Sequence, residues 1–384
     1  MSEFALETVN LEKKFGGLKV TSDLSLKIKA GARHALIGPN GAGKTTVINR
    51  LTGVLTPDSG RILLEGNDIT GLPVHTRVLR AVGDPAQRFA EDGLRVLRAA
   101  RFVATLDVSL DPATASAIEP SLNSYRKVSA ERVRDEWMKT AKAKRPSRAF
   151  EVMKDHGLLS ITAPELMESV GCEQNRHHAY DVWGHAMRCL DNCPPQPILR
   201  LAGLLHDVGK PRSRAFSEKT LDYTFYDHER IGAEMADPML ERLRFSNDER
   251  TRIVALVRHH LICYDGTWSD SAVRRWVRRV SPELLDDLYA LSEADVQSKG
   301  KDASEELEHI TQLKAHVAKV IAQGAAFNVK DLTIDGGSLI KELGIKPGPD
   351  IGRILRALLE EVVEEPSLNQ REALLARARE LLQS

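Results

Sequence analysis

Histidine and aspartate residues recur at wide intervals through the middle of the chain, in a pattern that could bind metal ions. They are His185, the pair His206-Asp207, His228, the pair His259-His260 and Asp295. Helical stretches separate them, so their side chains could converge in the core of a helical bundle. Imidazole and carboxylate groups together suit one or two divalent ions such as Mn²⁺, Mg²⁺, Ni²⁺ or Fe²⁺. Such ions lower the pKa of water, so the expected chemistry is hydrolysis.

The order of these residues, H…HD…H…H…D, resembles the HD phosphohydrolase superfamily. In that family the ligand of the fourth segment precedes Leu or Met, which favours His260 over its neighbour His259. The metal ligands implied by the resemblance are His185, His206, Asp207, His228, His260 and Asp295.

The resemblance implies catalytic roles for His206 and Asp207. Asp207 would bridge or anchor the metal and help to activate water for in-line attack on phosphorus. Lys210 follows three residues later and could neutralise phosphate charge, although a solvated lysine at a helix end is an equal alternative. The expected substrate is a phosphomonoester, a 2′,3′-cyclic nucleotide or an RNA end.

Three further residues lie near His185 in the sequence. His178 is seven residues earlier, so on a helix it would share nearly the same face, with Asp181 between them. We expect these two residues to orient the metal-binding histidine or to contact substrate. Cys189, four residues after His185, could suggest zinc, but no Cys/His pair completes a tetrahedral set. A buried, small apolar role is therefore preferred for Cys189.

The stretch LIGPNGAGKTT, residues 36–46, fits the phosphate-binding pattern G-x-x-x-x-G-K-[ST]. Residues 35–37 read as a buried strand and 46–51 as a helix, which is the context that the motif requires. Backbone N–H groups of such a loop surround phosphate, and ATP with Mg²⁺ is the expected ligand. The predicted phosphate-binding residues are Gly38, Asn40, Gly41, Gly43, Lys44, Thr45 and Thr46.

Residues 9–76 resemble the start of an ABC-transporter ATPase of the branched-chain amino-acid importer type. The resemblance implies that Phe15 stacks on adenine, although a core position in a small sheet is an equal alternative. The glutamine-bearing loop, the LSGGQ signature, the Asp-Glu strand and the switch histidine of such ATPases are missing. ATP hydrolysis should therefore be weak or absent, and a membrane-transporter partner is not expected.

From Leu79 onward the sequence resembles the C-terminal two thirds of a tRNA nucleotidyltransferase, the family of CCA-adding enzymes and poly(A) polymerases. LRAVGDPAQRFAEDGLRVLRAARF (79–102), VSAERVRDEWMK (128–139) and IDGGSLIKELGIKPGPDIGRIL (334–355) carry this resemblance. It implies that Asp92 and Arg95, at i and i+3 on a neck helix, contact the edge of a base; the alternative is a surface ion pair. The family's catalytic head carries a D-x-D pair, and none precedes Leu79. Nucleotide addition by this chain alone is therefore not expected.

These motifs imply an α+β chain, with a small α/β P-loop fragment followed by a large all-α body that contains an HD-domain helical bundle. Alternating apolar runs up to about residue 78 predict strands, and helical spacing predicts helices at 89–106 and 131–141 and a helix ending near 192. The expected domains are the P-loop fragment (1–78), a nucleotide- and RNA-binding neck (79–170), the HD domain (171–300) and a tRNA-contacting helical tail (301–384).

Composition limits the location and partners of the chain. Its 384 residues contain 54 Lys plus Arg and 54 Asp plus Glu, so any nucleic-acid surface must come from local clusters such as 139–145. Four scattered cysteines favour a reducing compartment, and no apolar run reaches the roughly 20 residues of a membrane span. We expect a cytoplasmic protein that binds tRNA or another RNA and acts on a nucleotide substrate.

The leading hypothesis is a metal-dependent HD phosphohydrolase on a tRNA-nucleotidyltransferase-like body without its catalytic head. One alternative is an RNA-binding module of the same family without catalysis. Another is an ATP-binding, ABC-type protein with weak or no hydrolysis.

Overall fold

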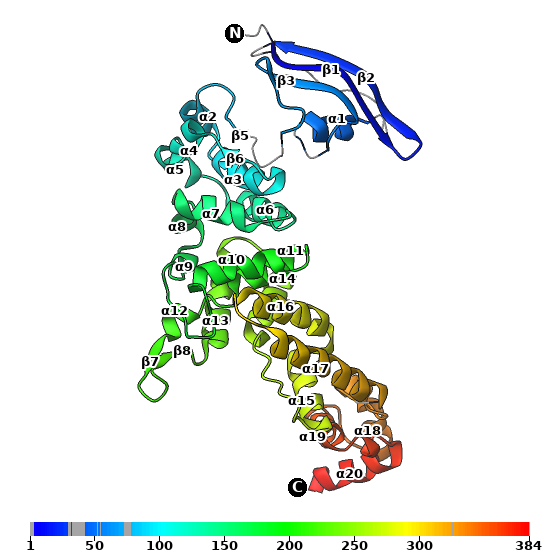
Figure 1. The fold of residues 1–384 in the computed structure, drawn as a ribbon. Helices are drawn as coiled ribbons and strands as arrows, with labels where there is room; N and C mark the ends of the chain where they lie inside the picture. The colour runs from blue at the N-terminus through cyan, green and yellow to red at the C-terminus, as the bar shows by residue number, and fades with distance from the viewer. Residues whose placement is uncertain are drawn as a thin grey trace. The chain divides into compact units, whose positions relative to one another are not determined.

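The computed structural model describes residues 4–29, 32, 43–51, 53, 55–72, 78–324 and 326–383. The chain divides into two compact units, residues 1–161 and 162–384. The first unit holds a small sheet and a helical part, and the second is almost wholly helical (Figure 1). The fold is therefore α+β, as predicted. None of the described helices is long and apolar enough to cross a bilayer.

The N-terminal sheet contains the strands expected from the alternating pattern. β1 (Phe4–Phe15) pairs antiparallel with both β2 (Leu18–Lys29) and β3 (Ser59–Leu64), and β3 pairs with β4 (Asn67–Asp68). Leu11 of β1 and Ile62 of β3 are fully buried. The predicted helix after the phosphate loop is α1 (Lys44–Leu51), which contacts β2. The predicted strand at 35–37 lies outside the described residues.

The helical part of the first unit is built around α3. Its elements are β5 (Val78–Leu79), α2 (Pro85–Glu91), α3 (Leu94–Leu106), β6 (Ser109–Leu110), α4 (Pro112–Ser116), α5 (Leu122–Tyr125), α6 (Ala130–Thr140) and α7 (Ser147–Asp155). β5 and β6 form a parallel pair, and α3 packs on both α6 and α7. Trp137 of α6 meets Phe150 of α7 edge to face, with ring centroids 5.1 Å apart.

The single helix predicted at 89–106 is wrong, because the chain breaks between α2 and α3. Asp92 has φ −151° and ψ 105°, an extended conformation that ends α2. Gly93 then lies against the next segment so closely that a Cβ atom there would stand 2.3 Å from the Ser124 carbonyl oxygen. This close approach of two backbones explains why glycine occupies the break. Asp92 and Arg95 consequently do not share one helical face.

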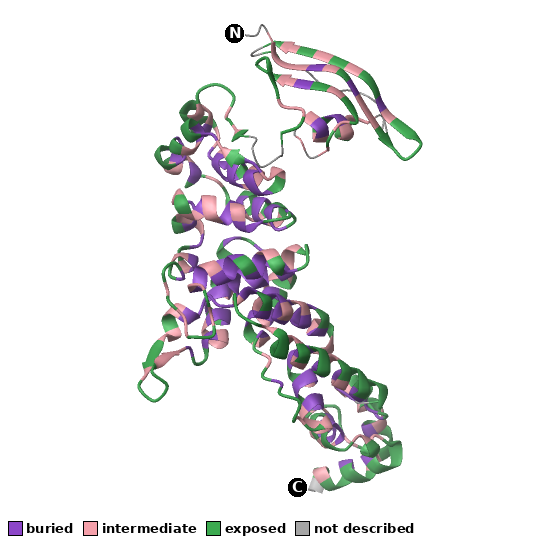
Figure 2. Ribbon diagram, in the orientation of Figure 1, coloured by how far each residue is buried: buried purple, intermediate pink, exposed green. Residues whose placement is uncertain are grey.

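The first half of the second unit is a bundle. Its helices and strands are α9 (Pro164–Met167), α10 (Val182–Asn192), α11 (Pro197–Leu205), α12 (Lys210–Ser213), β7 (Ala215–Ser217), β8 (Asp222–Thr224), α13 (His228–Arg242), α14 (Asn247–His259), α15 (Asp270–Val280) and α16 (Leu285–Ser298), and α8 (Leu159–Thr162) precedes them. Residues 199–205 of α11 are all buried, because α10, α14 and α16 contact it (Figure 2). α11 is thus the central helix of the bundle.

The second half contains α17 (Ser304–Ala322), α18 (Gly336–Leu343), α19 (Pro349–Glu364) and α20 (Arg371–Gln383). α18, α19 and α20 share a hydrophobic core that includes Leu339, Leu358 and Val362. Arg274 of α15 is buried and donates hydrogen bonds to the carbonyls of Val363 and Glu364 at the end of α19. Because these terminal carbonyls have no partner within their own helix, the arginine both satisfies them and attaches the tail to the bundle.

Replacing Gly93 by alanine should destabilise the first unit, because the new Cβ would displace backbone atoms rather than a flexible side chain. We expect the free energy of unfolding to fall by about 1–3 kcal/mol, the usual cost of overpacking. Urea-induced unfolding measures this change. Gly71→Ala is the matched control, since no atom lies within 4 Å of its added Cβ, and it should stay within about 0.5 kcal/mol of wild type. Equal effects of the two substitutions would contradict this account of the break.

Candidate metal centre and neck pocket

Five helices of the second unit bring the predicted metal-binding side chains together. His185 lies on α10, His206 and Asp207 directly follow α11, His228 begins α13, His260 directly follows α14, and Asp295 lies on α16. The four histidines and Asp207 are buried, and the side chain of Asp295 is 16% exposed. A polar cluster of this size inside a bundle requires partners for each of its atoms.

Backbone carbonyls orient three of the four imidazole rings. Nδ1 of His206 lies 2.8 Å from the Gly203 carbonyl oxygen, Nδ1 of His228 lies 2.7 Å from that of Phe225, and Nδ1 of His260 lies 2.8 Å from that of Val257. A carbonyl oxygen only accepts hydrogen bonds, so each Nδ1 must donate. In each neutral ring the lone pair is therefore on Nε2, the atom that faces the cluster.

The Nε2 atoms form two close pairs with Asp207 between them. Nε2 of His185 and His206 lie 3.1 Å apart, and Nε2 of His228 and His260 lie 3.3 Å apart. Asp207 directs Oδ2 to the first pair, 3.2 Å from His206, and Oδ1 to the second, 3.3 Å from His228.

Asp295 completes the first group, with Oδ1 2.9 Å from Nε2 of His185. The potential ligand atoms lie within 4.8 Å of one another in three groups: His185–His206–Asp295, Asp207–His228–His260 and His178–His185–Asp207. This donor set fits divalent ions: His185, His206 and Asp295 would hold one ion, His228 and His260 would hold another, and Asp207 could contribute to both.

The charges within the cluster are strongly coupled. Burial alone would raise the pKa of Asp207, but the charges of His206 and Lys210 hold it well below its usual range. Burial opposes a charge on His206 as well, yet Asp207 and Asp295 raise the pKa of that ring to about 10. Burial and the charge of His206 lower the pKa of His260 to about 3. Without a metal, His206 therefore carries the proton that balances the carboxylates.

Lys210 is buried, so the alternative of a solvated lysine is wrong. Its Nζ lies 2.7 Å from Oδ2 of Asp207 and 2.7 Å from Oε1 of Gln174. Gln174 was missed by the sequence analysis, because it lies in a loop with no motif. Lys210 contributes a fixed positive charge beside the carboxylate that links the two histidine pairs.

His178 and Asp181 differ from their predicted placement. α10 begins only at Val182, so His178 lies in the preceding turn, and its ring nevertheless packs edge to face on His185 with centroids 5.0 Å apart. Asp181 caps α10 by accepting a hydrogen bond from the Gly184 N–H at 2.8 Å, so it does not orient a histidine. Cys189 is fully buried in the bundle, as its predicted apolar role requires.

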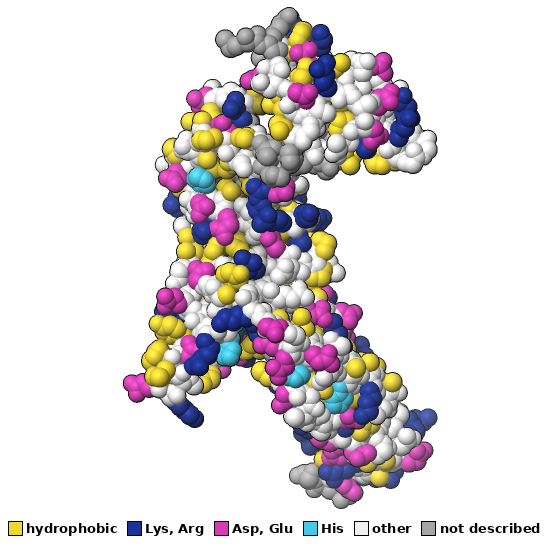
Figure 3. Space-filling view, viewed as in Figure 1, with side chains coloured by type: hydrophobic (Ala, Val, Ile, Leu, Met, Phe, Trp, Pro, Cys, Tyr) yellow, Lys and Arg dark blue, Asp and Glu magenta, His cyan; other side chains and the backbone are white. Residues whose placement is uncertain are grey.

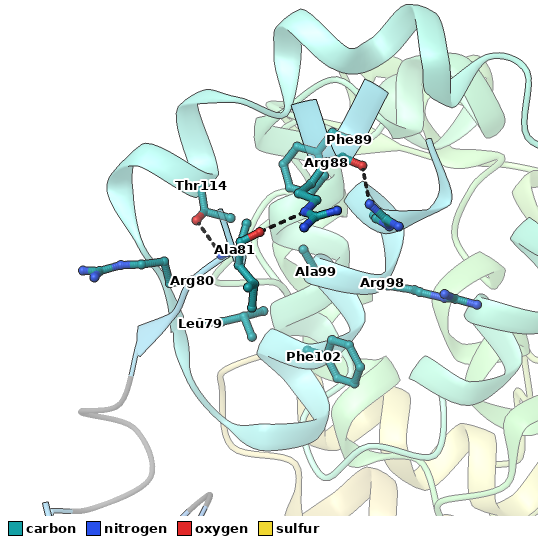
Figure 4. Close-up of a pocket in the computed structure, with 11 residues that line it drawn as sticks. Leu79, Arg80, Ala81, Arg88, Phe89, Arg98, Ala99, Phe102 and Thr114 are labelled. Atoms are coloured by element: carbon teal, nitrogen blue, oxygen red, sulfur yellow. Dashed lines mark hydrogen bonds between the residues drawn. The ribbon is translucent and has the colours of Figure 1, made fainter. Parts of the chain in front are cut away.

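One of the predicted base-contacting residues borders a pocket of about 310 Å³ in the helical part of the first unit (Figure 4). Arg95 lines this pocket, and its guanidinium donates to Glu91 at 2.6 Å and to the Arg88 carbonyl at 2.9 Å. Asp92 accepts hydrogen bonds from Arg132, the shorter at 3.0 Å.

Other side chains of this neck pocket were missed by the sequence analysis. They are chiefly arginines and aromatic rings: Arg80, Arg88, Arg98, Phe89 and Phe102. The spacing of arginines in RFAEDGLRVLR, at 88, 95 and 98, was the available signal. The pocket thus combines apolar walls with several guanidinium groups.

The structure describes only part of the predicted phosphate loop. Gly38, Asn40 and Gly41 lie outside the described residues, whereas Lys44, Thr45 and Thr46 form the first turn of α1. Gly43 has φ +77°, and a Cβ there would meet the Val20 carbonyl oxygen at 2.8 Å, so this position requires glycine. Phe15 is 49% exposed, so the alternative of a core position is wrong.

Metal binding at the centre should release a proton, because the cation competes for Nε2 of a His206 ring whose pKa is raised to about 10. Titration calorimetry with Mn²⁺ in two buffers of different ionisation enthalpy should show release of about one proton near pH 7. The affinity for Mn²⁺ should rise by up to about tenfold per pH unit up to about pH 10, because His206 loses its competing proton as the pH rises. A binding enthalpy that is independent of the buffer would contradict this assignment.

Two families of known proteins match the chain, and the ABC-transporter match extends past the predicted boundary at residue 78. A family model of ABC transporters matches residues 21–153, and a family model of tRNA nucleotidyltransferase domain 2 matches residues 224–378. An ABC transporter ATP-binding protein of Azorhizobium caulinodans is 44% identical over 82 residues, which are 21% of this chain and 29% of that protein.

The relatives that match the helical part of this chain are longer proteins than the segment they match. The A-adding tRNA nucleotidyltransferase of Deinococcus radiodurans is 35% identical over 294 residues, covering 74% of this chain and 67% of that protein. The crystal structure of the Bacillus stearothermophilus CCA-adding enzyme in complex with CTP has the same fold, with a TM-score of 0.54, 19% identity and coverage of 84% of this chain and 71% of that chain. The chain therefore belongs to the tRNA nucleotidyltransferase family, and its N-terminal part is similar to ABC transporter ATP-binding proteins.

Proposed function

We propose that this chain is a metal-dependent phosphohydrolase built on a tRNA-nucleotidyltransferase body. The observation that supports this function best is the pair of histidine groups on either side of the buried Asp207 carboxylate. The proposed ligands are His185, His206, Asp207 and Asp295 for one ion, and Asp207, His228 and His260 for the other. Mn²⁺, Mg²⁺, Ni²⁺ and Fe²⁺ all suit such mixed nitrogen and oxygen donors.

A divalent ion in this centre would supply Lewis acidity, which makes water a nucleophile near neutral pH and stabilises charge on phosphate. The histidines hold their Nε2 lone pairs inward because their Nδ1 protons are fixed on carbonyls. Attack of water on phosphorus breaks the ester P–O bond, and the leaving alkoxide takes one proton from water. Lys210 would help to keep Asp207 ionised, because its ammonium group lies 2.7 Å from that carboxylate.

The proposed substrates are phosphomonoesters, 2′,3′-cyclic nucleotides or RNA ends. The family relatives are named for their action on tRNA, and we propose that tRNA or another RNA is a partner of this chain as well. Asp92, Arg95 and the arginines of the neck pocket would contact a nucleotide base. We do not propose nucleotide addition by this chain alone, because no D-x-D pair precedes Leu79.

A second candidate function is RNA binding without chemistry, favoured by the exposed basic residues Lys142, Lys144 and Arg145 after α6. The P-loop segment supports a third activity, ATP binding with weak or no hydrolysis. Lys44→Ala should abolish binding of a fluorescent ATP analogue if that segment is functional.

The purified protein should hydrolyse bis(p-nitrophenyl) phosphate or 2′,3′-cyclic AMP when Mn²⁺ or Ni²⁺ is added. Asp207→Asn and His260→Ala should each lower kcat/KM at least about 100-fold. Substituting a residue that only orients a metal ligand already costs about 10- to 100-fold, so losing a ligand should cost no less. His259→Ala is the matched control, because the ring of His259 is half-buried outside the centre, and it should retain most activity. Unchanged hydrolysis by Asp207→Asn would refute the assignment.

Binding of tRNA should depend on the basic segment. The double substitution Lys142→Glu with Lys144→Glu should weaken binding about tenfold at moderate salt, because phosphate contacts dominate nucleic-acid affinity. Filter binding with labelled tRNA measures this loss, and the double substitution Lys27→Glu with Lys29→Glu on the N-terminal sheet makes the same change in net charge at another exposed surface. Binding that persists in EDTA is expected, whereas equal losses in both variants would argue against a specific surface.

A further inference from the structure

The hairpin formed by β7 and β8 presents large apolar side chains to solvent. This hairpin, residues 214–226, exposes Phe216 (58%), Leu221 (77%) and Tyr226 (81%). It projects from the bundle beside α12 and α13 (Figure 1), and hydrophobic and charged side chains adjoin each other in that region of the surface (Figure 3). Exposed aromatic rings concentrated on one short element indicate a binding function.

Both ends of the hairpin connect directly to the metal centre. On one side it follows α12, whose first residue, Lys210, pairs with Asp207 at 2.7 Å. On the other side Phe225 contributes the carbonyl that orients His228, at 2.7 Å, and its ring lies 5.6 Å from Nζ of Lys210. The exposed Tyr226 is thus attached to the same short segment that fixes a metal-binding histidine.

Two guanidinium groups lie against the hairpin. Arg214 stacks on the ring of Tyr223, with Cζ 3.7 Å from the ring centroid, and Tyr223 meets Phe216 edge to face at 5.7 Å. Arg176, from the loop before α10, donates to Asp222 at 2.9 Å and also to the Thr220 carbonyl.

This combination favours nucleic acid over an apolar protein face. Aromatic rings next to planar cations are the surface on which single-stranded bases stack, because every base has a π face and the backbone is anionic. The site must also be compatible with a phosphate ester at the metal centre, and a nucleic-acid end carries both groups.

We propose that the hairpin is a stacking platform for the single-stranded end of an RNA whose terminal phosphate lies at the metal centre. This inference rests on the proposed phosphohydrolase function and specifies its substrate class. The preferred substrates are oligoribonucleotides that end in a 2′,3′-cyclic phosphate or a phosphomonoester, rather than free mononucleotides. Phe216 and Tyr226 bind the terminal bases and take no part in the hydrolytic step.

The test compares an RNA pentamer ending in a 2′,3′-cyclic phosphate with 2′,3′-cyclic AMP, using full-length protein with Mn²⁺. The double variant Phe216→Ser with Tyr226→Ser should raise KM for the pentamer roughly tenfold or more, the effect of losing stacked bases. Its kcat for the pentamer and both constants for 2′,3′-cyclic AMP should stay within about twofold of wild type. The double variant Phe216→Tyr with Tyr226→Phe should keep the wild-type KM for the pentamer, because both aromatic rings are retained.

Leu221→Ser is the control for loss of exposed apolar surface, since Leu221 is exposed on the same hairpin but cannot stack. An unchanged KM for the pentamer in the double variant, an equal loss for both substrates, or an equal loss in Leu221→Ser would overturn the proposal. If wild-type protein hydrolyses neither substrate, the proposed function fails. Fluorescence anisotropy of a labelled 3′-phosphorylated pentamer then decides the role of the hairpin: roughly tenfold weaker binding by the double variant supports it, and equal binding overturns it.

Discussion

Asp207 is a carboxylate buried among imidazole rings, and the surrounding bundle has to compensate its charge. An unpaired buried charge is costly, and removing its partners is strongly destabilising. Asp207 meets this requirement through Lys210 and through histidines from four different helices. Residues 199–205 of α11 are buried, and Asp207 follows this helix, so the packing of α11 places the carboxylate inside the bundle.

Helix ends explain how the imidazoles acquire their orientation. His206 and His260 directly follow α11 and α14, where the last carbonyl groups have no partner within the helix. Each histidine donates Nδ1–H to the carbonyl three residues before it. One hydrogen bond thus satisfies a terminal carbonyl and turns the Nε2 lone pair toward the cluster. His228 differs, because it begins α13 and its acceptor is the carbonyl of Phe225 in the turn before that helix.

Residue order and periodicity predicted much of this structure, because both depend on local sequence. The strands on either side of the P-loop, the helix ending at Asn192 and the helix at 130–140 lie where the patterns place them. The break at Gly93 was missed because its cause is the Ser124 backbone, about thirty residues away in sequence. The burial of Lys210 was open for a similar reason, since one of its two partners, Gln174, lies 36 residues away in sequence.

We propose that Asp207 would serve two metal positions, one in each pair of histidines. Anomalous diffraction from crystals soaked in Mn²⁺, recorded at the manganese edge, tests it most directly. We expect two peaks separated by about 3.5–4 Å, one beside His185 and His206 and one beside His228 and His260, with Asp207 in contact with both. A single peak away from Asp207, or no peak within this cluster, would contradict it.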